Sequence, residues 1–315
     1  MKRWLVWSGL GVFLAGALTL VVSANEPIHF KYSTFTVPPA VTLSVNAINN
    51  YGTISGYYYD ASNNVISFVR SSNGKLTYYS DPADTATPGF TRGFQINDQG
   101  TVAGQFYNSA ALEYSGYLFN NGHFSTFNVP DEPAGSTTAA VGINDLGTQI
   151  CGWFAAYPDF SPQEAFISSY GKVELFAVHG STVTACFGLN NRGYAVGTYE
   201  VSSGAIRGFL RSPNGEITDI DFPGAPLTPG TAPCVGTIAG TQPFGINDNG
   251  VISGHFWDSE YNEHGFLRYP NGIYQQFDIP GAYQTSGGSL NDAGTVVGHY
   301  ADSSCNSYGY IADFQ

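Results

Sequence analysis

The sequence predicts an all-β fold, and three observations support this prediction. The 315 residues include 39 Gly and 17 Pro and are 15% aromatic, a composition that suits strands and tight turns better than helices. One short phrase recurs six times along the chain, and the two chain ends carry complementary parts of the repeated unit. Together these observations predict a closed six-bladed β-propeller built from four-stranded blades.

The repeated phrase has the form I/L-N-N/D-x-G and leads into a strand that contains a glycine and ends in an aromatic residue. Successive phrases begin 44 to 57 residues apart, which is room for four short strands and their turns. The six phrases are INNYGTISGYY from Ile48, INDQGTVAGQF from Ile96, INDLGTQICGWF from Ile143, LNNRGYAVGTY from Leu189, INDNGVISGHF from Ile246 and LNDAGTVVGHY from Leu290.

Each unit divides into four expected strands. The first ends at the I/L-N pair, and the next residues form a hairpin turn, because Asn and Asp bond to their own backbone and Gly accepts positive φ. The second strand carries a glycine, which we expect to let a neighbouring sheet approach closely, and an aromatic residue that fills the core beside it. The third strand reads RGFLR or HGFLR, and a proline follows the fourth, as in QQFDIPG.

The chain ends predict how the ring closes. The segment HFKYSTFTVPPA, residues 29–40, matches a fourth strand and precedes the first phrase. After the last phrase the chain runs through a third strand and reaches Gln315 without a fourth. We therefore expect an N-terminal outer strand to complete the last blade, which pairs the open edge of that sheet.

Residues 1–24 have the pattern of a signal peptide. Lys2 and Arg3 precede an apolar stretch from Trp4 to Val22, and Val22-Ser23-Ala24 offers small residues for cleavage. Retention of the apolar stretch as a membrane anchor is the alternative, because it approaches spanning length. With cleavage, residues 25–315 form a single propeller domain of a secreted, periplasmic or cell-surface protein.

The acidic charge argues against two classes of partner. The chain has 11 Lys+Arg against 24 Asp+Glu, and loss of the leader leaves 9 basic residues and a net charge of −15. Nucleic acids and anionic membranes are bound by clustered Lys and Arg, so we expect no nucleic-acid partner and no membrane contact after cleavage. We expect a monomer whose partner is a glycan or an extracellular protein.

Two further motifs follow the phrase in several units. The fifth unit continues with H-G-F and with a D-x-P-G-A ending, and the matching residues are Ile246, Asn247, Asp248, Gly250, Gly254, Phe256, His264, Gly265, Phe266, Asp278, Pro280, Gly281 and Ala282. In this pattern the units resemble the HAF-type extracellular repeat family. The third unit departs from it with Glu164-Ala165-Phe166 and with Ala177-Val178-His179-Gly180, which lacks the proline. The resemblance covers nearly the whole mature chain and implies an exported repeat protein, but it brings no catalytic residues.

Four cysteines remain after cleavage, and an exported compartment permits disulfides. Cys151 and Cys186 lie on expected strands of units three and four, whereas Cys234 and Cys305 lie in loops expected on one face of units five and six. We predict the pairs Cys151–Cys186 and Cys234–Cys305, each joining neighbouring blades. A metal role is disfavoured, because the sequence has no CxxC or paired Cys/His spacing.

Aspartates follow the second strand in three neighbouring blades, at Asp60, Asp258 and Asp302. One interpretation is a Ca²⁺ site, although Ca²⁺ needs six to eight converging oxygens. The favoured interpretation is that each aspartate opens its loop as an Asx turn. On that interpretation we expect no cofactor.

The residue after each strand glycine varies between units, and such variation is where a repeat scaffold encodes specificity. These residues are Tyr57, Gln105, Trp153, Thr198, His255 and His299. Because flat rings stack on sugars and other planar ligands, Tyr57, Trp153 and Trp257, which lies two positions after His255, are candidate ligand-binding residues. Asp60, at the loop entrance after the second strand of the first unit, is the fourth candidate. Interblade packing is the favoured alternative for the aromatic residues.

The candidates for general acid and base catalysis are Asp258, His255, His299 and Asp302. The sequence contains no nucleophile elbow, P-loop or H-E-x-x-H motif. The even spread of repeat residues favours a non-catalytic binding or surface propeller. The alternative is a carbohydrate-active hydrolase or lyase with its site on the loop face near blades five, six and one, which requires carboxyls and histidines to converge on one pocket.

Overall fold

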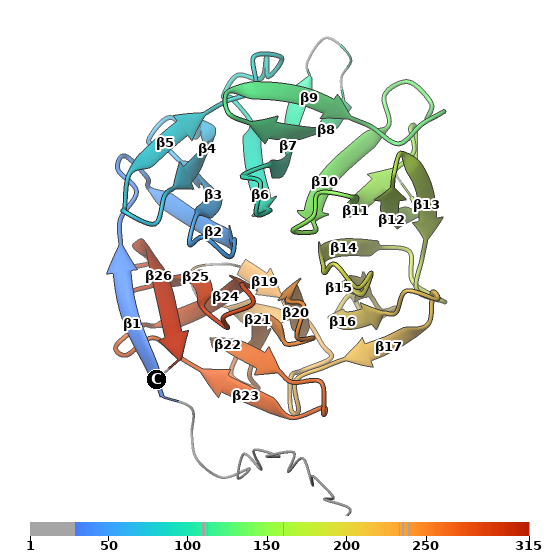
Figure 1. Cartoon of the computed structure of the whole chain (residues 1–315). Coiled ribbons are helices and arrows are strands. Elements are labelled where there is room, and N and C mark those ends of the chain that lie inside the picture. The colour runs from blue at the N-terminus through green and yellow to red at the C-terminus, as the bar shows by residue number, and fades with distance from the viewer. Residues whose placement is uncertain are drawn as a thin grey trace, which may run out of the picture.

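The computed structural model describes residues 29–108, 111, 113–159, 161–232, 234, 236–238 and 240–314. The predicted signal peptide therefore lies outside the described residues. Within them the strands form six four-stranded antiparallel sheets arranged as a ring, with one strand of each sheet nearest the axis (Figure 1). None of the described residues forms a helix long and apolar enough to cross a membrane.

The blades are listed here from the inner to the outer strand. Blade one contains β2 (Thr42–Ile48), β3 (Ile54–Tyr59), β4 (Val65–Arg70) and β5 (Leu76–Tyr79). Blade two contains β6 (Thr91–Ile96), β7 (Val102–Asn108), β8 (Glu113–Asn120) and β9 (His123–Phe127). Blade three contains β10 (Thr137–Ile143), β11 (Gln149–Ala155), β12 (Gln163–Ser169) and β13 (Lys172–Phe176).

Blade four contains β14 (Thr184–Leu189), β15 (Ala195–Glu200), β16 (Ile206–Arg211) and β17 (Ile217–Ile220). The insertion before blade five carries a small hairpin, β18 (Gly230–Ala232) and β19 (Gly236–Ile238). Blade five contains β20 (Thr241–Ile246), β21 (Ile252–Trp257), β22 (Glu263–Arg268) and β23 (Tyr274–Phe277). Blade six contains β24 (Gln284–Leu290), β25 (Val296–Ala301), β26 (Ser307–Phe314) and β1 (Phe30–Phe35).

The ring closes as the chain ends predict. Strand β1 pairs antiparallel with β26, from Phe30 opposite Phe314 to Phe35 opposite Gly309, and the C-terminus lies beside β1 (Figure 1). The N-terminal strand therefore occupies the outer edge of blade six. Because the first and last strands share one sheet, the ring cannot open without breaking that sheet.

The strand glycine of blade five makes close contacts both within its own blade and with the next blade. A Cβ atom added at Gly254 would lie 2.1 Å from the carbonyl oxygen of Gln242 in the same blade. Gly254 also lies opposite the fully buried Phe266 of β22. The neighbouring blade also approaches Gly254 closely, because a Cβ atom added at Gly287 of β24 would lie 2.0 Å from the Gly254 carbonyl oxygen.

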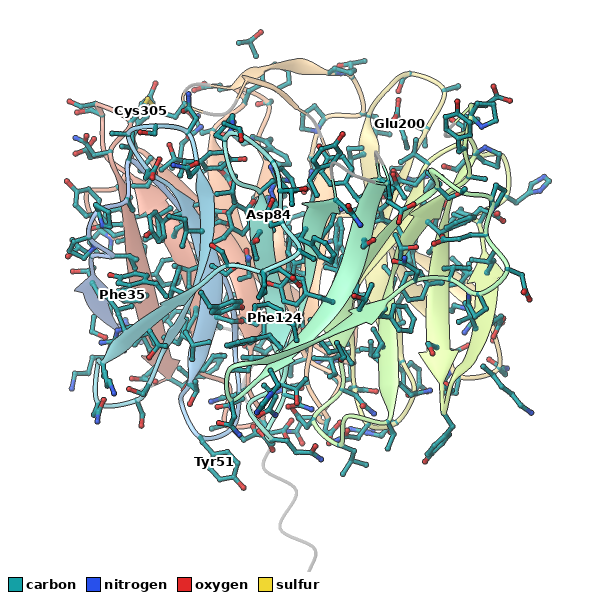
Figure 2. The ribbon with its side chains drawn as sticks, turned by 90° about the horizontal axis from the view of Figure 1, so that it is seen from above. Phe35, Tyr51, Asp84, Phe124, Glu200 and Cys305 are labelled. Atoms are coloured by element: carbon teal, nitrogen blue, oxygen red, sulfur yellow. A yellow bond between two sulfur atoms is a disulfide. The ribbon has the colours of Figure 1, made fainter. Side chains whose placement is uncertain are left out.

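Both predicted disulfides are present. Cys151 of β11 pairs with Cys186 of β14, joining blades three and four. Cys234 of the insertion pairs with Cys305 of blade six. Figure 2 shows Cys305, Asp84 and Glu200 on one face of the ring and Tyr51 on the opposite face; we call the first the loop face and the second the turn face. Disulfides of this kind are typical of proteins that fold in an oxidising environment.

On the turn face, asparagine side chains join neighbouring blades near the axis. The side-chain Nδ2 of Asn49 donates to the backbone oxygen of Asn97, Asn190 donates to Asn247, Asn247 donates to Asn291, and Asn291 donates back to Asn49. Each Oδ1 meanwhile accepts from the backbone of its own turn, as Asn247 does from Val251. One side chain thus fixes the turn and also links it to the next blade.

Blade three breaks this pattern, because its phrase contains one additional residue. Asn144 closes its turn against Gln149, five residues on, whereas Asn97 closes its turn against Thr101, four residues on. The Nδ2 of Asn144 consequently donates to Thr148 of its own turn. The Nδ2 of Asn97 has no partner among the described residues, so the amide link is also missing between blades two and three. Of the two junctions without the link, the one between blades three and four is spanned by the Cys151–Cys186 disulfide.

Replacing Asn247 with Ala should destabilise the ring more than replacing Asn144 with Ala. Asn247→Ala removes the interblade bond to the buried carbonyl of Asn291, which keeps its bond from Gly294, and leaves the N–H of Val251 without its acceptor, a cost of about 1–3 kcal/mol. Asn144→Ala removes bonds within one turn and no link to another blade. We expect the midpoint of thermal unfolding of Asn247→Ala to lie lower by several degrees. Equal midpoints for the two variants would contradict a role of the amide in joining blades.

Candidate functional site

A cavity of about 440 Å³ occupies the central channel. Its lining comes from the inner strands of all six blades and from second strands of several, so the site belongs to the ring as a whole. A smaller cavity nearer the turn face is lined by the I/L residues that begin the phrases. Between the two, the side-chain amide of Gln95 crosses the channel and donates to the carbonyl of Phe244, 2.8 Å away.

A bulge in each inner strand supplies one residue to the cavity. In every blade the register between the first and second strands shifts just before the phrase, for example between Pro243 and Gly245. A bulge redirects the additional side chain, which here faces the channel. The residues two positions before each phrase all line the cavity: Asn46, Phe94, Val141, Phe187, Phe244 and Gly288. We call these six the floor residues.

The variable position after the strand glycine supplies the walls. Five of the six residues that the sequence analysis identified there line the cavity, namely Tyr57, Gln105, Trp153, His255 and His299, whereas Thr198 does not. Residues four before the phrase add Ser44, Arg92, Gln242 and Ser286. The positions that differ between repeats are therefore brought together around one space.

One side of the cavity is aromatic. Its half-buried rings come from blades one to five: Tyr57, Phe94, Trp153, Phe187 and Phe244. The rings of Phe187 and Phe244 are nearly parallel, with centroids 4.9 Å apart. Trp257 also contributes to the wall but is only 2% exposed, because its ring packs edge-on against His255. Tyr57 and Trp153 offer ring surface to the cavity, whereas Trp257 mainly supports His255.

The other side of the cavity is polar and lies where blades five, six and one meet. The Nδ1 atom of His255 lies 3.7 Å from the Glu263 carboxylate and 3.2 Å from both the hydroxyl of Ser286 and the carbonyl of Gly287. His299 borders the same cavity and lies 3.5 Å from the backbone nitrogen of Val45. This side offers hydrogen-bond donors and acceptors at close spacing.

Burial sets the charge of the polar side. Desolvation lowers the pKa of His255 and of His299 to about 4, so both rings are neutral at pH 7. Desolvation also raises the pKa of Glu263, and the attraction of His299 and a hydrogen bond to Ser286 offset part of that rise. Glu263 is the one carboxyl group in the described lining. The sequence pattern did not indicate this residue, Arg92 or the aromatic floor residues.

Arg92 lies on the aromatic side. Its guanidinium lies over the ring of Phe90, 4.3 Å from the centroid, and over the ring of Tyr57, 5.3 Å away. It also donates to the hydroxyl of Tyr59 over 2.6 Å. These contacts fix the cation against the wall and use part of its donor capacity.

The three loop aspartates do not line the central cavity. Asp60 accepts from the backbone of Ser62 and Asn64, and Asp302 accepts from Ser304 and Asn306. These bonds, together with those from the Asn64 and Asn306 side chains, lower the pKa of both aspartates. Each aspartate has the Asx-turn geometry that the sequence favoured. The candidates Asp60, Asp258 and Asp302 are thus separated from His255 and His299.

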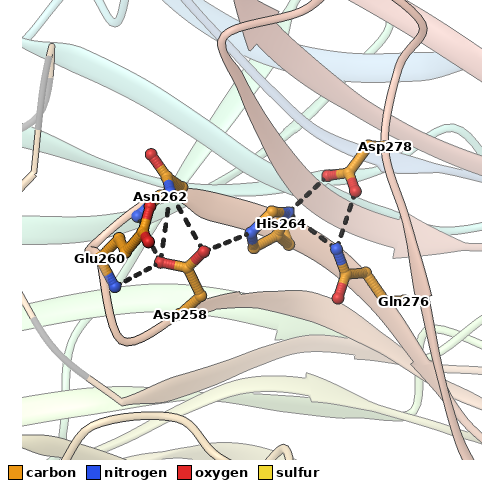
Figure 3. Close-up of polar contacts among 6 residues, drawn as sticks. All are labelled: Asp258, Glu260, Asn262, His264, Gln276 and Asp278. Carbon is orange, nitrogen blue, oxygen red and sulfur yellow. Dashed lines mark hydrogen bonds and ion pairs between the residues drawn. The ribbon is translucent and has the colours of Figure 1, made fainter.

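Asp258 makes the same turn and is also linked to His264. Figure 3 shows His264 between two carboxylates, 3.2 Å from Asp258 and 2.8 Å from Asp278. The hydrogen bond to Asp278, followed in effect by the charges and the bond to Asp258, raises the pKa of His264 against the effect of burial. Burial tends to raise the pKa of Asp258, but bonds from Asn262, His264 and Glu260 lower it overall. His264 of β22 thus links the residue that follows β21 to the residue that follows β23 in blade five.

The turn-face end of the channel carries an acidic ring formed by the residues after the turn asparagines: Asn50, Asp98, Asp145, Asn191, Asp248 and Asp292. The Asn50 amide donates to three of the carboxylates, and the backbone of Asp248 donates to Asp292. Oxygens of Asp145, Asp248 and Asp292 lie within 4.8 Å of one another. Burial and these neighbouring charges raise the pKa of Asp145 to about 7. Hydrogen bonds between blades explain why these acidic side chains lie close together.

Comparison with known proteins identifies the fold. No family model matches the chain, and no curated protein matches it. The fucose-specific lectin from Aleuria aurantia aligns with a TM-score of 0.53 at 12% identity, covering 90% of this chain and 97% of the lectin. AofleA from Arthrobotrys oligospora aligns with a TM-score of 0.54 at 12% identity, covering 92% and 88%. The Aleuria lectin is described as a six-bladed β-propeller, and this chain is similar to it in fold.

Replacing Glu263 with Gln should stabilise the protein at neutral pH. A carboxyl group whose pKa is raised by folding stabilises the fold fully below about pH 4.3, and this contribution is lost as pH rises through its pKa in the folded state. At pH 7 the glutamine avoids a buried charge, so we expect its unfolding midpoint to exceed that of the parent by about 2 °C or more. The gain should vanish near pH 4. A lower midpoint at pH 7 would contradict the assigned direction of the shift.

His264 should make the stability depend on pH in a higher range. Because its pKa is raised, its proton stabilises the fold fully below about pH 6.5, and that stability is lost as pH rises through the pKa in the folded state. The unfolding midpoint of His264→Gln should therefore fall less than that of the parent above pH 6.5, by about 2 °C. His123→Gln, at an exposed histidine, is the matched control. Parallel curves for the parent and His264→Gln would exclude this role.

Proposed function

We propose that this protein is a non-catalytic binding propeller whose central cavity holds a neutral saccharide. The observation that carries the proposal is the division of the cavity into an aromatic side, with five half-buried rings, and a polar side around Glu263. Ligand sites usually combine apolar walls with a few fixed polar groups. A sugar ring has the complementary form, with C–H faces for the rings and hydroxyls for the polar side.

The volume and charge of the site support a small neutral ligand. A cavity of about 440 Å³ lies within the range of about 300–1,000 Å³ that is common for ligand pockets. The acidic chain, with a formal net charge of −13, repels polyanionic glycans at long range. The two histidines at the polar side are neutral at pH 7. Hydroxyl groups, which donate and accept, suit these rings better than a second charge does.

The lining favours binding over hydrolysis. Glycosidases of the common type place two carboxyl groups about 5–9.5 Å apart across the scissile bond. In the part of the chain that the structure describes, the cavity has one carboxyl group, Glu263, and the loop aspartates form turns elsewhere. A second carboxyl partner for Glu263 is therefore missing from the lining.

The proposal extends to the setting of the protein. The leader at residues 1–24, the resemblance to HAF-type repeats and the two disulfides support an exported member of that family. The fold neighbours include a fucose-specific lectin, which makes glycans a reasonable first class of ligand to test. At 12% identity the likeness concerns the fold, so the choice of sugar depends on the cavity itself.

The proposal predicts saccharide binding that depends on the aromatic side. Purified protein should bind at least one member of a panel of neutral saccharides, including α-methyl-L-fucoside, in isothermal titration calorimetry. Phe187→Ala and Trp153→Ala should each raise the Kd about tenfold or more, because each removes a ring on which the sugar stacks. Tyr170→Ala is the control, because Tyr170 is 86% exposed and lies outside the cavity lining.

Two outcomes would overturn this function. Binding that is unchanged in both cavity variants would place the saccharide elsewhere, and failure of the whole panel to bind would remove the saccharide class. Hydrolysis or cleavage of a bound sugar that is abolished in Glu263→Gln would replace binding by catalysis.

A further inference from the structure

A second cavity of about 200 Å³ adjoins the central one between blades six and one. Three residues line both cavities: Glu263, Ser286 and His299. The polar side of the central cavity is therefore a partition between the central cavity and the second cavity. The rest of the second lining comes from β2, β24, β25 and β26 and from the Cys234–Cys305 disulfide.

The second cavity has the same chemistry as the first on a smaller scale. Thr42, Ser307 and Gln284 supply hydroxyl and amide groups. Tyr300 supplies an aromatic surface, and its ring stacks on Tyr308 with centroids 5.2 Å apart. Gln284 is 4% exposed, and its Nε2 lacks a hydrogen-bond partner among the described residues. A hydrogen-bonding ligand suits such a lining better than an apolar one.

The disulfide gives this cavity a fixed wall. Cys234 and Cys305 are both exposed and lie on different loops, so their bond adds little to the core. It does hold the insertion against the loop of blade six, where both cysteines border the cavity. The bond thus fixes the shape of the cavity beside the shared partition.

We propose that the two cavities are two subsites of one site and that the ligand is an oligosaccharide of at least two units. This inference rests on the proposed binding function. One sugar unit occupies the central cavity, and the next occupies the space bounded by Thr42, Tyr300 and Ser307. The linkage between them lies beside Glu263, Ser286 and His299, which contact both units.

The test compares ligand lengths and fills the second cavity. The probes are methyl α-glucoside, maltose and maltotriose; methyl β-glucoside, cellobiose and cellotriose; and α-methyl-L-fucoside with Fucα1-6GlcNAc. In a series that binds, the two-unit probe should bind about tenfold or more tighter than the one-unit probe, because the added unit makes its own contacts. Thr42→Trp should abolish this gain and leave the one-unit Kd within about twofold.

Controls separate this inference from the proposed function. Thr42 is exposed at the first residue of β2, so the chain can accept a larger side chain there, and Ser307→Tyr fills the same cavity from β26 if Thr42→Trp does not fold. Thr218→Trp places the same ring on the exposed outer strand β17, away from both cavities. Phe187→Ala should weaken all lengths alike.

The outcomes are distinct. Equal affinities for one-unit and two-unit probes, or a length effect that survives Thr42→Trp and Ser307→Tyr, would overturn the second subsite and leave saccharide binding intact. Failure of every probe to bind would count against the proposed function, and with it this inference.

Discussion

The amide of the turn asparagine is the interaction on which the ring depends. It accepts from the backbone of its own turn and donates to the same turn of the next blade, as Asn247 does toward Asn291. These groups are buried, so an unmade bond would cost more than a made one contributes. The repeat of the bond at four of the six junctions fixes the spacing of the inner strands. The width of the channel, and so the cavity, follows from that spacing.

The bulge beside each turn explains how a regular ring holds an irregular site. The phrase keeps I/L-N for the core and the turn, whereas the bulged residue before it points into the channel and is free to vary. Phe187 and Phe244 make the cavity aromatic on one side, and Asn46 and Gly288 leave it polar and open on the other. The scaffold and the site therefore use different positions of the same repeat.

Features set by the phase of the repeat could be predicted from the sequence, and side chains outside the repeated positions could not. The strand order, the closure by residues 29–40 and both disulfides follow from the phase of the repeat. The variable position after the glycine also indicated five residues of the cavity. The repeat does not indicate Glu263, because only the folded ring brings this residue of blade five to the same cavity as Ser286 and His299 of blade six. The floor residues left a signal, since comparison of the position two before each phrase shows three phenylalanines.

The charge of the polar side restricts what the site can recognise. Burying a carboxylate costs free energy, and a protonated histidine beside it would offset that cost through an ion pair. Here the flanking histidines have a pKa of about 4 and stay neutral at pH 7. Arg92, the one Arg or Lys side chain in the described lining, lies on the aromatic side against Tyr57 and Phe90. Glu263 therefore has neutral donors and acceptors around it, and the burial that raises its pKa also disfavours further charge on this side of the cavity. A neutral, hydroxyl-rich molecule meets that requirement without bringing a second charge into the ring.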